Sequence, residues 1–243
     1  MERSNSYIFI YSIVMVVVVA ALLSIASYSL KDTQKSNVRK EKMQNILSSI
    51  QIESTPENVE ELYTKYIINS SIIDAQGKLI PYVLEPNGKI FDTVRAFDVD
   101  MKKLYALPRA KRTLPLFEAQ KEGEKFVIIP LRGKGLWGPV WGYVALQDDN
   151  NTVYGAVFDH QGETPGLGAE INKDKFEHMF KGKQLFDTAG TFVSVKVKKG
   201  GAAPDDIHGV DAISGGTITS NGVNDMIDTC VSSYASYLQS NKQ

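Results

Sequence analysis

Cysteine is almost missing from this chain of 243 residues, which contains only Cys230. One thiol cannot form an internal disulfide, and it cannot supply the several thiolates that hold an iron–sulfur cluster. The histidines are scarce as well: His160, His178 and His208 lie far apart and fit no metal-ligand spacing. The sequence therefore predicts neither a metal site nor thiol chemistry in this chain.

The net charge is also close to zero, because the chain contains 27 Lys and Arg residues and 28 Asp and Glu residues. Without a basic stripe interleaved with aromatic residues, nothing favours nucleic acid as a partner. No nicotinamide-binding fingerprint of the Rossmann type is present, and the Gly-x-Ser-x-Gly elbow of hydrolases is missing. We expect no NADH site here, and we assign no catalytic residues.

One long apolar run is present, from Tyr7 to Leu30, and it carries no charge. Its 24 residues are long enough to cross a bilayer. A cleaved signal peptide is the alternative, but its apolar run would be shorter and a clear small-residue cleavage site would follow. We therefore predict a short tail over 1–6, a retained transmembrane helix over 7–30, and an α+β domain over 31–243.

The domain itself shows mixed helix and strand signals. Strands are predicted over 125–130, 140–147 and 152–158, as an antiparallel meander whose first turn holds Gly133, Gly135 and Gly138. Further predictions are helices over 35–50, 57–68 and 172–180, turns at 75–78 and 86–89, a basic loop over 108–115, a glycine-rich loop over 162–168 and a strand over 192–198. Apolar residues at helical spacing over 223–238 predict a packed final helix, with Cys230 as a buried small hydrophobe.

The stretch 211–222 joins a strand-like segment to this final helix and contains Ser214-Gly215-Gly216-Thr217. Glycine allows a backbone to approach a ligand closely, and the N-terminus of a helix favours a phosphate. The local pattern therefore indicates a phosphate cradle with a threonine hydroxyl at its mouth. An ordinary turn capped by Ser or Thr has the same pattern.

Residues 211–217 resemble the flavinylation signature Asp-x-x-Ser-Gly-Ala/Gly-Thr of bacterial proteins that carry FMN as a phosphoester on threonine, with Gly216 in place of the usual alanine. A membrane segment, Gly135-Leu136-Trp137-Gly138-Pro139 and Glu163-Thr164-Pro165-Gly166-Leu167-Gly168 precede the signature in that order. Together these motifs resemble the NqrC family, which supplies one subunit of the Na⁺-translocating NADH:quinone reductase (NQR). The RnfG subunit of the related Rnf complex shares the signature.

The resemblance implies one covalent cofactor, FMN on Thr217, attached by a separate flavin transferase that recognises the motif formed by Asp211, Ser214, Gly215, Gly216 and Thr217. Thr219 is interpreted as a decoy hydroxyl. The other residues expected beside FMN are Ser214, Gly215, Gly216 and Ser220 at its phosphate, Leu136, Trp137, Thr164 and Leu167 on its ring, and the backbone amides from Gly166 to Gly168 at its polar edge. His160 and Glu163 are interpreted as structural, because a flavin that only relays electrons needs no acid or base.

The resemblance also implies a role and a place for the chain. As one subunit of an oxidoreductase, it would relay electrons from an iron–sulfur-bearing subunit to another FMN-bearing subunit on the path from NADH to ubiquinone, while the whole complex exports Na⁺. Residues 31–70 would form a helical neck and residues 71–243 the flavin domain. An electron carrier of the RnfG type, or a membrane-anchored binding or assembly module without redox chemistry, is the alternative.

Orientation is the point at which charge and resemblance disagree. The positive-inside rule, applied to the residues after the apolar run, would place the domain in the cytoplasm. The resemblance implies the periplasmic side of the bacterial inner membrane, and we follow it because long domains translocate despite flanking charge. The charges concerned are Lys31, Lys35, Arg39, Lys40 and Lys42 against Asp32 and Glu41.

Overall fold

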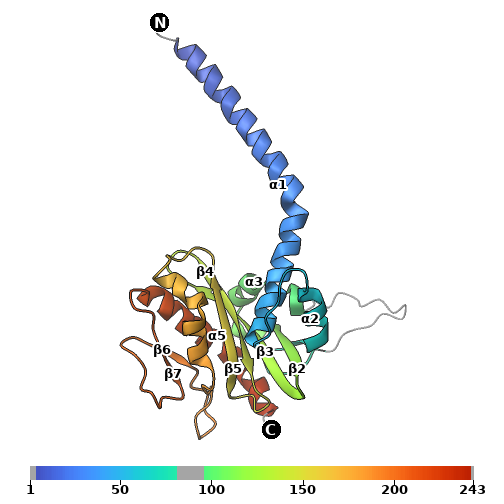
Figure 1. The fold of residues 1–243 in the computed structure, drawn as a ribbon, viewed down its shortest axis with the longest axis vertical. Helices are drawn as coiled ribbons and strands as arrows, with labels where there is room; N and C mark the ends of the chain where they lie inside the picture. Colours follow the sequence, from blue (N-terminus) through green and yellow to red (C-terminus); the bar gives the residue numbers. More distant parts are fainter. Residues whose placement is uncertain (1–3, 81–95, 242–243) are drawn as a thin grey trace, which may run out of the picture. The chain divides into compact units, whose positions relative to one another are not determined.

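A computed structural model describes residues 4–80 and 96–241 of the chain (Figure 1). By compactness the chain divides into two units, Met1–Lys42 and Met43–Gln243. The first unit holds most of α1, a continuous helix over Asn5–Ser49 that includes all but the last residue of the helix predicted for 35–50. In the part of the chain that the structure describes, α1 alone is long and apolar enough to cross a membrane. This helix fits the expected membrane anchor.

The second unit is built on a five-stranded antiparallel sheet with the strand order β1-β2-β3-β4-β5. Each strand pairs with its neighbour along the chain, so the predicted meander is confirmed and extended by two strands. The strands are β1 (Ile67–Ile73), β2 (Leu114–Lys121), β3 (Glu124–Lys134), β4 (Pro139–Leu146) and β5 (Val153–His160).

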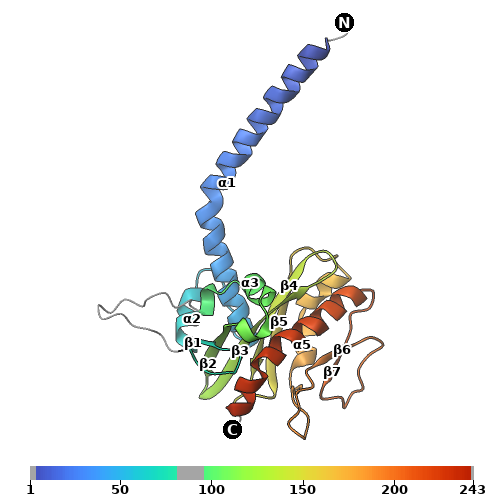
Figure 2. The same cartoon turned by 180° about the vertical axis from the view of Figure 1, so that it is seen from behind.

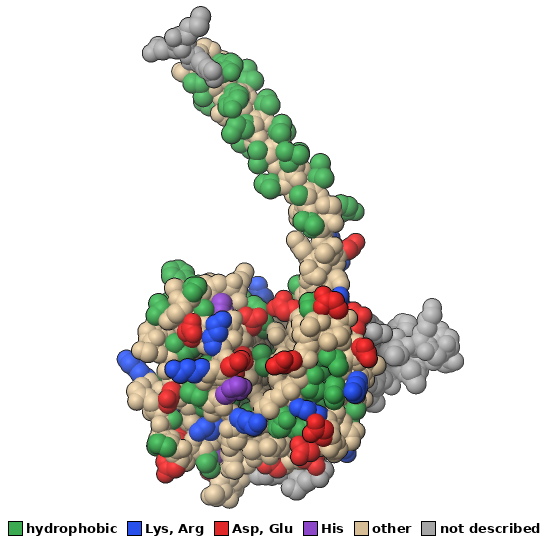
Figure 3. Space-filling view, viewed as in Figure 1, with side chains coloured by type: hydrophobic (Ala, Val, Ile, Leu, Met, Phe, Trp, Pro, Cys, Tyr) green, Lys and Arg blue, Asp and Glu red, His purple; other side chains and the backbone are tan. Residues whose placement is uncertain are grey.

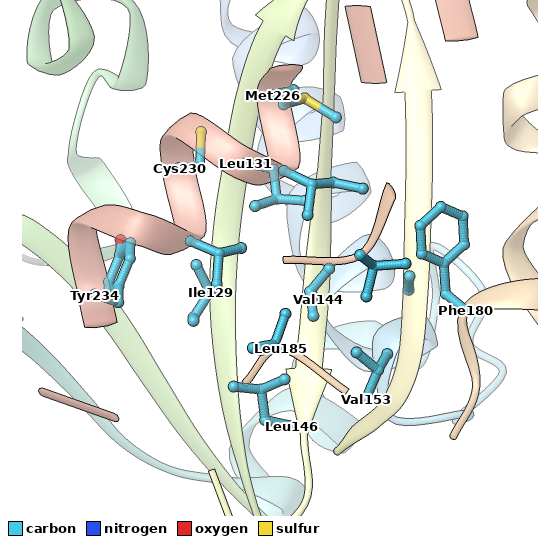
Figure 4. Close-up of a cluster of buried hydrophobic side chains, with 14 of the residues drawn as sticks. Ile129, Leu131, Val144, Leu146, Val153, Phe180, Leu185, Met226, Cys230 and Tyr234 are labelled. Atoms are coloured by element: carbon cyan, nitrogen blue, oxygen red, sulfur yellow. The ribbon is translucent and has the colours of Figure 1, made fainter. Parts of the chain in front are cut away.

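The final helix α5 (Thr217–Ser240) covers one face of this sheet and packs chiefly on β3. Figure 4 shows Cys230 and Tyr234 of α5 beside Ile129 and Leu131 of β3. Alternate residues of a strand point to the same face, so Ile129 and Leu131 face α5 while Ile128 faces away. Cys230 is fully buried, which confirms its prediction as a core residue.

The opposite face is covered by the last turns of α1 and by α2 (Val59–Tyr66). Ile46 and Leu47, which belong to the second unit, pack in one apolar cluster with Phe117 and Ile128 of the sheet. Burying apolar side chains on both faces fixes the strand register, because a slip by one residue would turn every side chain to the wrong face. The sheet therefore forms a rigid centre for the loops at its ends.

Shorter elements complete the domain, and Figure 2 shows the β6–β7 pair beside α5. β6 (Lys196–Lys198) pairs in parallel with β7 (Gly209–Asp211). The helical elements between the strands are η1 (Ala96–Asp98), α3 (Met101–Ala106), η2 (Arg109–Lys111), η3 (Gly168–Asn172), α4 (Asp174–Glu177) and η4 (His178–Phe180).

Several sequence predictions need correction. The strand predicted over 192–198 is wrong in extent and placement, because Ser194 has φ 64°, which breaks the extended run, and β6 stays outside the meander. The helix predicted for 172–180 is broken into α4 and η4 after a 3₁₀ turn. Gly133 lies within β3 rather than in the turn that follows. The turn predicted at 86–89 lies outside the described residues.

Candidate functional site

The signature residues run from the end of β7 into the first turn of α5, and glycine is required there. Gly215 has φ +76°, and a Cβ atom at this position would lie 2.6 Å from Leu167 Cδ2. The N–H of Gly216 donates to the carbonyl of Ile213 at 3.0 Å, which closes a tight turn just before the helix. A larger residue at position 215 would be strained in its backbone and would clash with Leu167.

The N-terminus of α5 has no side-chain cap. Its first intrahelical bond runs from the Ser220 N–H to the Gly216 carbonyl at 2.9 Å. The N–H groups of Thr217, Ile218 and Thr219 therefore point out of the helix without an intrahelical acceptor. Free N–H groups at the positive end of a 24-residue helix form a ready site for a phosphate.

The first turn of α5 carries three hydroxyl groups, but they differ in exposure. Thr217 is partly exposed, whereas Thr219 is only 2% exposed and its Oγ1 donates to Glu163 Oε2 at 2.5 Å. Ser220 is fully buried, and its Oγ accepts from the Ile213 N–H at 3.0 Å. Thr217 is thus the hydroxyl of this turn that a solvent-borne reagent can reach. The expected contact of Ser220 with a phosphate stays a prediction.

Glu163 brings the three sequence motifs together. Its Oε1 accepts from the Trp137 backbone N–H at 2.9 Å, while its Oε2 accepts from Thr219. The turn over 135–138, the loop over 163–168 and the start of α5 therefore meet at one buried carboxylate. From the sequence, Glu163 is predicted only to be structural, because nothing in the sequence shows which segments it joins.

Exposed apolar side chains surround this meeting point. Leu136, Leu167 and Ile218 are exposed, and Trp137 is 70% exposed. We call Leu136, Trp137, Leu167 and Ile218 the apolar rim. Figure 3 shows hydrophobic side chains gathered over the β3–β4 turn, at the upper left of the domain. Trp137 is therefore a surface residue and not part of the core, as its place in a glycine turn predicts.

A hollow of about 330 Å³ adjoins the signature on its other side. Gly166, Met179, Ala212, Ile213 and Ser214 are among the residues that line it. A volume of this size lies at the lower end of the range for ligand pockets. The hollow lies next to Ser214, so a ligand at the N-terminus of α5 has both a polar end and apolar walls within reach.

The amides of the glycine-rich loop are less available than the sequence predicts. The Gly166 N–H donates to Glu170 Oε1 at 3.0 Å, and the Leu167 N–H donates to the Thr164 carbonyl at 3.1 Å. Both donors serve the turn itself, in which Gly166 has φ +75°. Thr164 is exposed and Gly168 is buried, and their predicted roles beside a cofactor stay predictions.

The residues present fit FMN, the cofactor that the resemblance implies. The phosphate matches the uncapped helix N-terminus, and the Thr217 hydroxyl lies at that same end. An isoalloxazine ring needs apolar walls with few polar groups, and the apolar rim offers them.

Comparison with known proteins agrees with this geometry. Residues 135–232 match the family model described as FMN-binding domain, a span that includes both motif loops, the signature and most of α5. The chain is 33% identical over 220 residues to the NqrC subunit of the Na(+)-translocating NADH-quinone reductase of Vibrio vulnificus (strain YJ016), covering 87% of this chain and 84% of that protein. The corresponding subunit of Haemophilus ducreyi is 36% identical over 207 residues, covering 83% and 80%.

Solved structures give the same result. The crystal structure of the NqrC subunit of this reductase from Parabacteroides distasonis superposes with a TM-score of 0.74 at 39% identity, covering 86% of this chain and 96% of that chain. The crystal structure of Shewanella oneidensis NqrC superposes with a TM-score of 0.66 at 28% identity, covering 83% and 98%. The α+β fold with its antiparallel sheet is thus shared by both.

Proposed function

Because the chain belongs to the NqrC family of Na⁺-translocating NADH-quinone reductase subunits, we propose that it is a membrane-anchored electron carrier that holds FMN covalently on Thr217. The apolar helix α1 supports the anchor, and the FMN-binding domain supports the cofactor. The observation that carries the assignment to Thr217 is the contrast between its accessible hydroxyl and the buried, hydrogen-bonded hydroxyl of Thr219.

Attachment to Thr217 needs help from another protein. Among the residues that the structure describes, no acid or histidine hydrogen-bonds to the Thr217 hydroxyl, and a threonine without a base is a weak nucleophile. A flavin transferase would supply the base and FAD. The bond from Thr217 Oγ1 to phosphorus forms as the pyrophosphate bond of FAD breaks, AMP leaves, and the hydroxyl proton passes to the transferase base. The exposed Ser214 and Gly215 are accessible to such an enzyme.

FMN, when bound, supplies reversible electron exchange. The residues of this chain have the task of holding it: the α5 N-terminus binds the phosphate, and the apolar rim packs against the ring and limits its contact with water. A covalent tether prevents loss of the cofactor on the periplasmic side, where we place the domain. The electrons would come from an iron–sulfur-bearing subunit and leave to another FMN-bearing subunit, and Na⁺ export would belong to the whole complex.

The test is in-gel flavin fluorescence with intact mass, on full-length protein co-expressed with a flavin transferase. Thr217→Ala should abolish covalent flavin. Thr219→Val is the matched control, because it removes a hydroxyl two residues away but keeps the side-chain volume, and it should retain covalent flavin. Covalent flavin in the Thr217→Ala variant would contradict the assignment. Absence of flavin from the unaltered chain, with the transferase active on another substrate, would instead favour a binding or assembly module.

A further inference from the structure

We propose that Glu163 is the positioning residue of the flavin site, holding both motif loops and the first turn of α5 in the arrangement that the bound ring requires. This inference rests on the proposed function. It assigns to Glu163 no contact with the reacting atoms: the carboxylate acts through Trp137 and Thr219, whose own positions it fixes.

Both carboxylate oxygens of Glu163 are in use. Oε1 accepts from the Trp137 N–H at 2.9 Å and Oε2 accepts from Thr219 Oγ1 at 2.5 Å. The Glu163 N–H donates to His160 Nδ1 at 3.2 Å, which anchors the backbone to the end of β5. The side chain is 4% exposed, and a carboxylate buried to this degree must be hydrogen-bonded to be tolerated. Each segment that it joins is thus held by a strong, directional contact.

Gly135 and Gly168 have no side chain, and this leaves room for the Glu163 carboxylate. A Cβ atom at Gly135 would lie 2.5 Å from Glu163 Oε1, and a Cβ atom at Gly168 would lie 2.6 Å from Glu163 Oε2. Neither position has a positive φ angle, so these glycines are explained by contact rather than by backbone conformation. The two loops close around Glu163 because they carry glycine at these points.

The segments that Glu163 joins carry the residues expected to hold the cofactor. Trp137 of the apolar rim donates its backbone N–H to Glu163, and the bond from Thr219 to Glu163 fixes the helical turn that also presents Thr217. Leu167, four residues after Glu163, packs against Gly215 of the signature. Glu163 therefore controls where the rim lies relative to Thr217. Its buried negative charge would also oppose the addition of electrons to a ring held nearby.

The experiment compares Glu163→Ala and Glu163→Gln in full-length protein co-expressed with the transferase. The glutamine can keep both contacts, since its amide oxygen can accept from the Trp137 N–H while its NH₂ donates to Thr219 Oγ1. Glu177→Ala is the control, because Glu177 Oε1 also accepts a backbone N–H, that of Phe158 at 2.7 Å, but joins none of the three motifs. The readouts are covalent FMN content, the visible circular dichroism of the flavin and its midpoint potential.

All three variants should carry covalent FMN, because the signature is unchanged. Glu163→Ala should lose most of the visible circular dichroism and shift the potential. Glu163→Gln should restore the dichroism but keep a raised potential, since the geometry returns without the charge. Glu177→Ala should lower thermal stability and change neither flavin signal.

Unchanged dichroism and potential in Glu163→Ala would overturn the inference, and so would an equal change in Glu177→Ala, which would mark a general effect of lost stability. If Glu163→Ala does not fold, Thr219→Val decides instead, because it removes the contact at Glu163 Oε2 and leaves Glu163 itself in place; unchanged flavin dichroism in that variant overturns the inference. A missing flavin in the unaltered chain would refute the proposed function instead, so the two failures are distinguishable.

Discussion

Two hollows of the domain both have charged side chains in their linings and differ in their place relative to the signature. The larger one, about 480 Å³, lies beside β5 and is lined by charged side chains that include Asp159, Asp174, Glu177 and Lys181. The smaller one, about 330 Å³, adjoins the flavinylation signature, and its lining combines apolar side chains such as Ile213 with charged ones: Glu170, Lys173, Lys175 and Asp211. Of the two, the smaller hollow has signature residues, Asp211 and Ser214, in its lining. Volume and lining charge therefore do not single out the proposed cofactor site, whereas contact with the signature does.

The two regions also differ in their glutamates: Glu177 is half-buried, whereas Glu163 is buried. In the larger hollow, burial raises the pKa of Glu177 to about 7, the bond from the Phe158 N–H opposes this, and the nearby Asp174 and Asp159 raise it further. At the proposed flavin site, Glu163 instead joins three segments with both carboxylate oxygens. Glu177 is therefore partly protonated near neutral pH, whereas the contacts of Glu163 connect three segments of the chain.

The largest effect on stability should come from Gly168→Ala. Its Cβ atom would clash with Thr219 Oγ1 and lie 2.6 Å from Glu163 Oε2, so the contact between loop and helix must open. We expect a loss of about 1–3 kcal/mol of unfolding free energy, as for overpacked core sites, together with a weaker flavin dichroism.

The matched control for this change is Gly162→Ala, in the same loop. A Cβ atom there meets nothing within 4 Å, so the change in stability should stay within about 0.5 kcal/mol. Both are measured by thermal unfolding of the full chain in detergent. Equal destabilisation of the two variants would show that the loop around Glu163 is not tightly packed.

The next largest effect should be a dependence of stability on pH, caused by Glu177 in the larger hollow. The pKa of Glu177 rises from 4.5 to about 7 on folding, so between these values the folded state binds a proton that the unfolded state has lost. Stability should therefore fall as the pH rises from 4.5 to about 7 and then level off. For a carboxyl that keeps some contact with water, the loss should be on the order of 2 kcal/mol.

Glu177→Gln isolates this effect, because the amide can still accept from the Phe158 N–H but does not titrate in this range. Unfolding curves measured at several pH values should show a flatter dependence in the variant. The same slope in both proteins would assign the pH dependence to other groups.

The smallest effect on stability should come from Trp137→Ala. Trp137 is 70% exposed, so its loss should change the free energy of unfolding by less than about 0.5 kcal/mol. The flavin absorbance or potential should nevertheless change, because the apolar rim loses its largest side chain. Leu107→Ala, at another exposed apolar residue outside the motifs, should leave both unchanged. Identical flavin spectra in the two variants would remove Trp137 from the site.

The sequence predicts those parts of the fold that depend on local pattern. The strands β3 to β5 alternate apolar residues between clear turns, and α5 carries an apolar stripe at helical spacing. β1 and β2 are not predicted from the sequence. β1 begins directly after a helix with no turn signal between them, and β2 contains Pro115, which is unfavourable in a strand, near its start. The two strands pair residues about 40 positions apart in the chain, such as Ile73 with Leu114, and no local sequence pattern predicts a pairing over that distance.

The candidate site, like the fold, can be predicted from the sequence only in part. The motif residues, Thr217 among them, are recognisable along the chain by their order and spacing. The burial of Thr219 and the role of Glu163 are not, because both depend on the meeting of three segments that the sheet brings together. Tertiary contacts therefore decide which of two neighbouring threonines is accessible.

The central claim is that Thr217 carries FMN, and fragmentation mass spectrometry of the unaltered protein tests it most directly. Trypsin cleaves after Lys199 and next after Lys242, so both threonines fall on one peptide and its mass alone cannot separate them. Fragments that end between Thr217 and Thr219 can. We expect fragments that contain Thr217 but not Thr219 to retain the mass of FMN less one water. The same mass found only on fragments that contain Thr219, or an unmodified peptide with the transferase active, would contradict the claim.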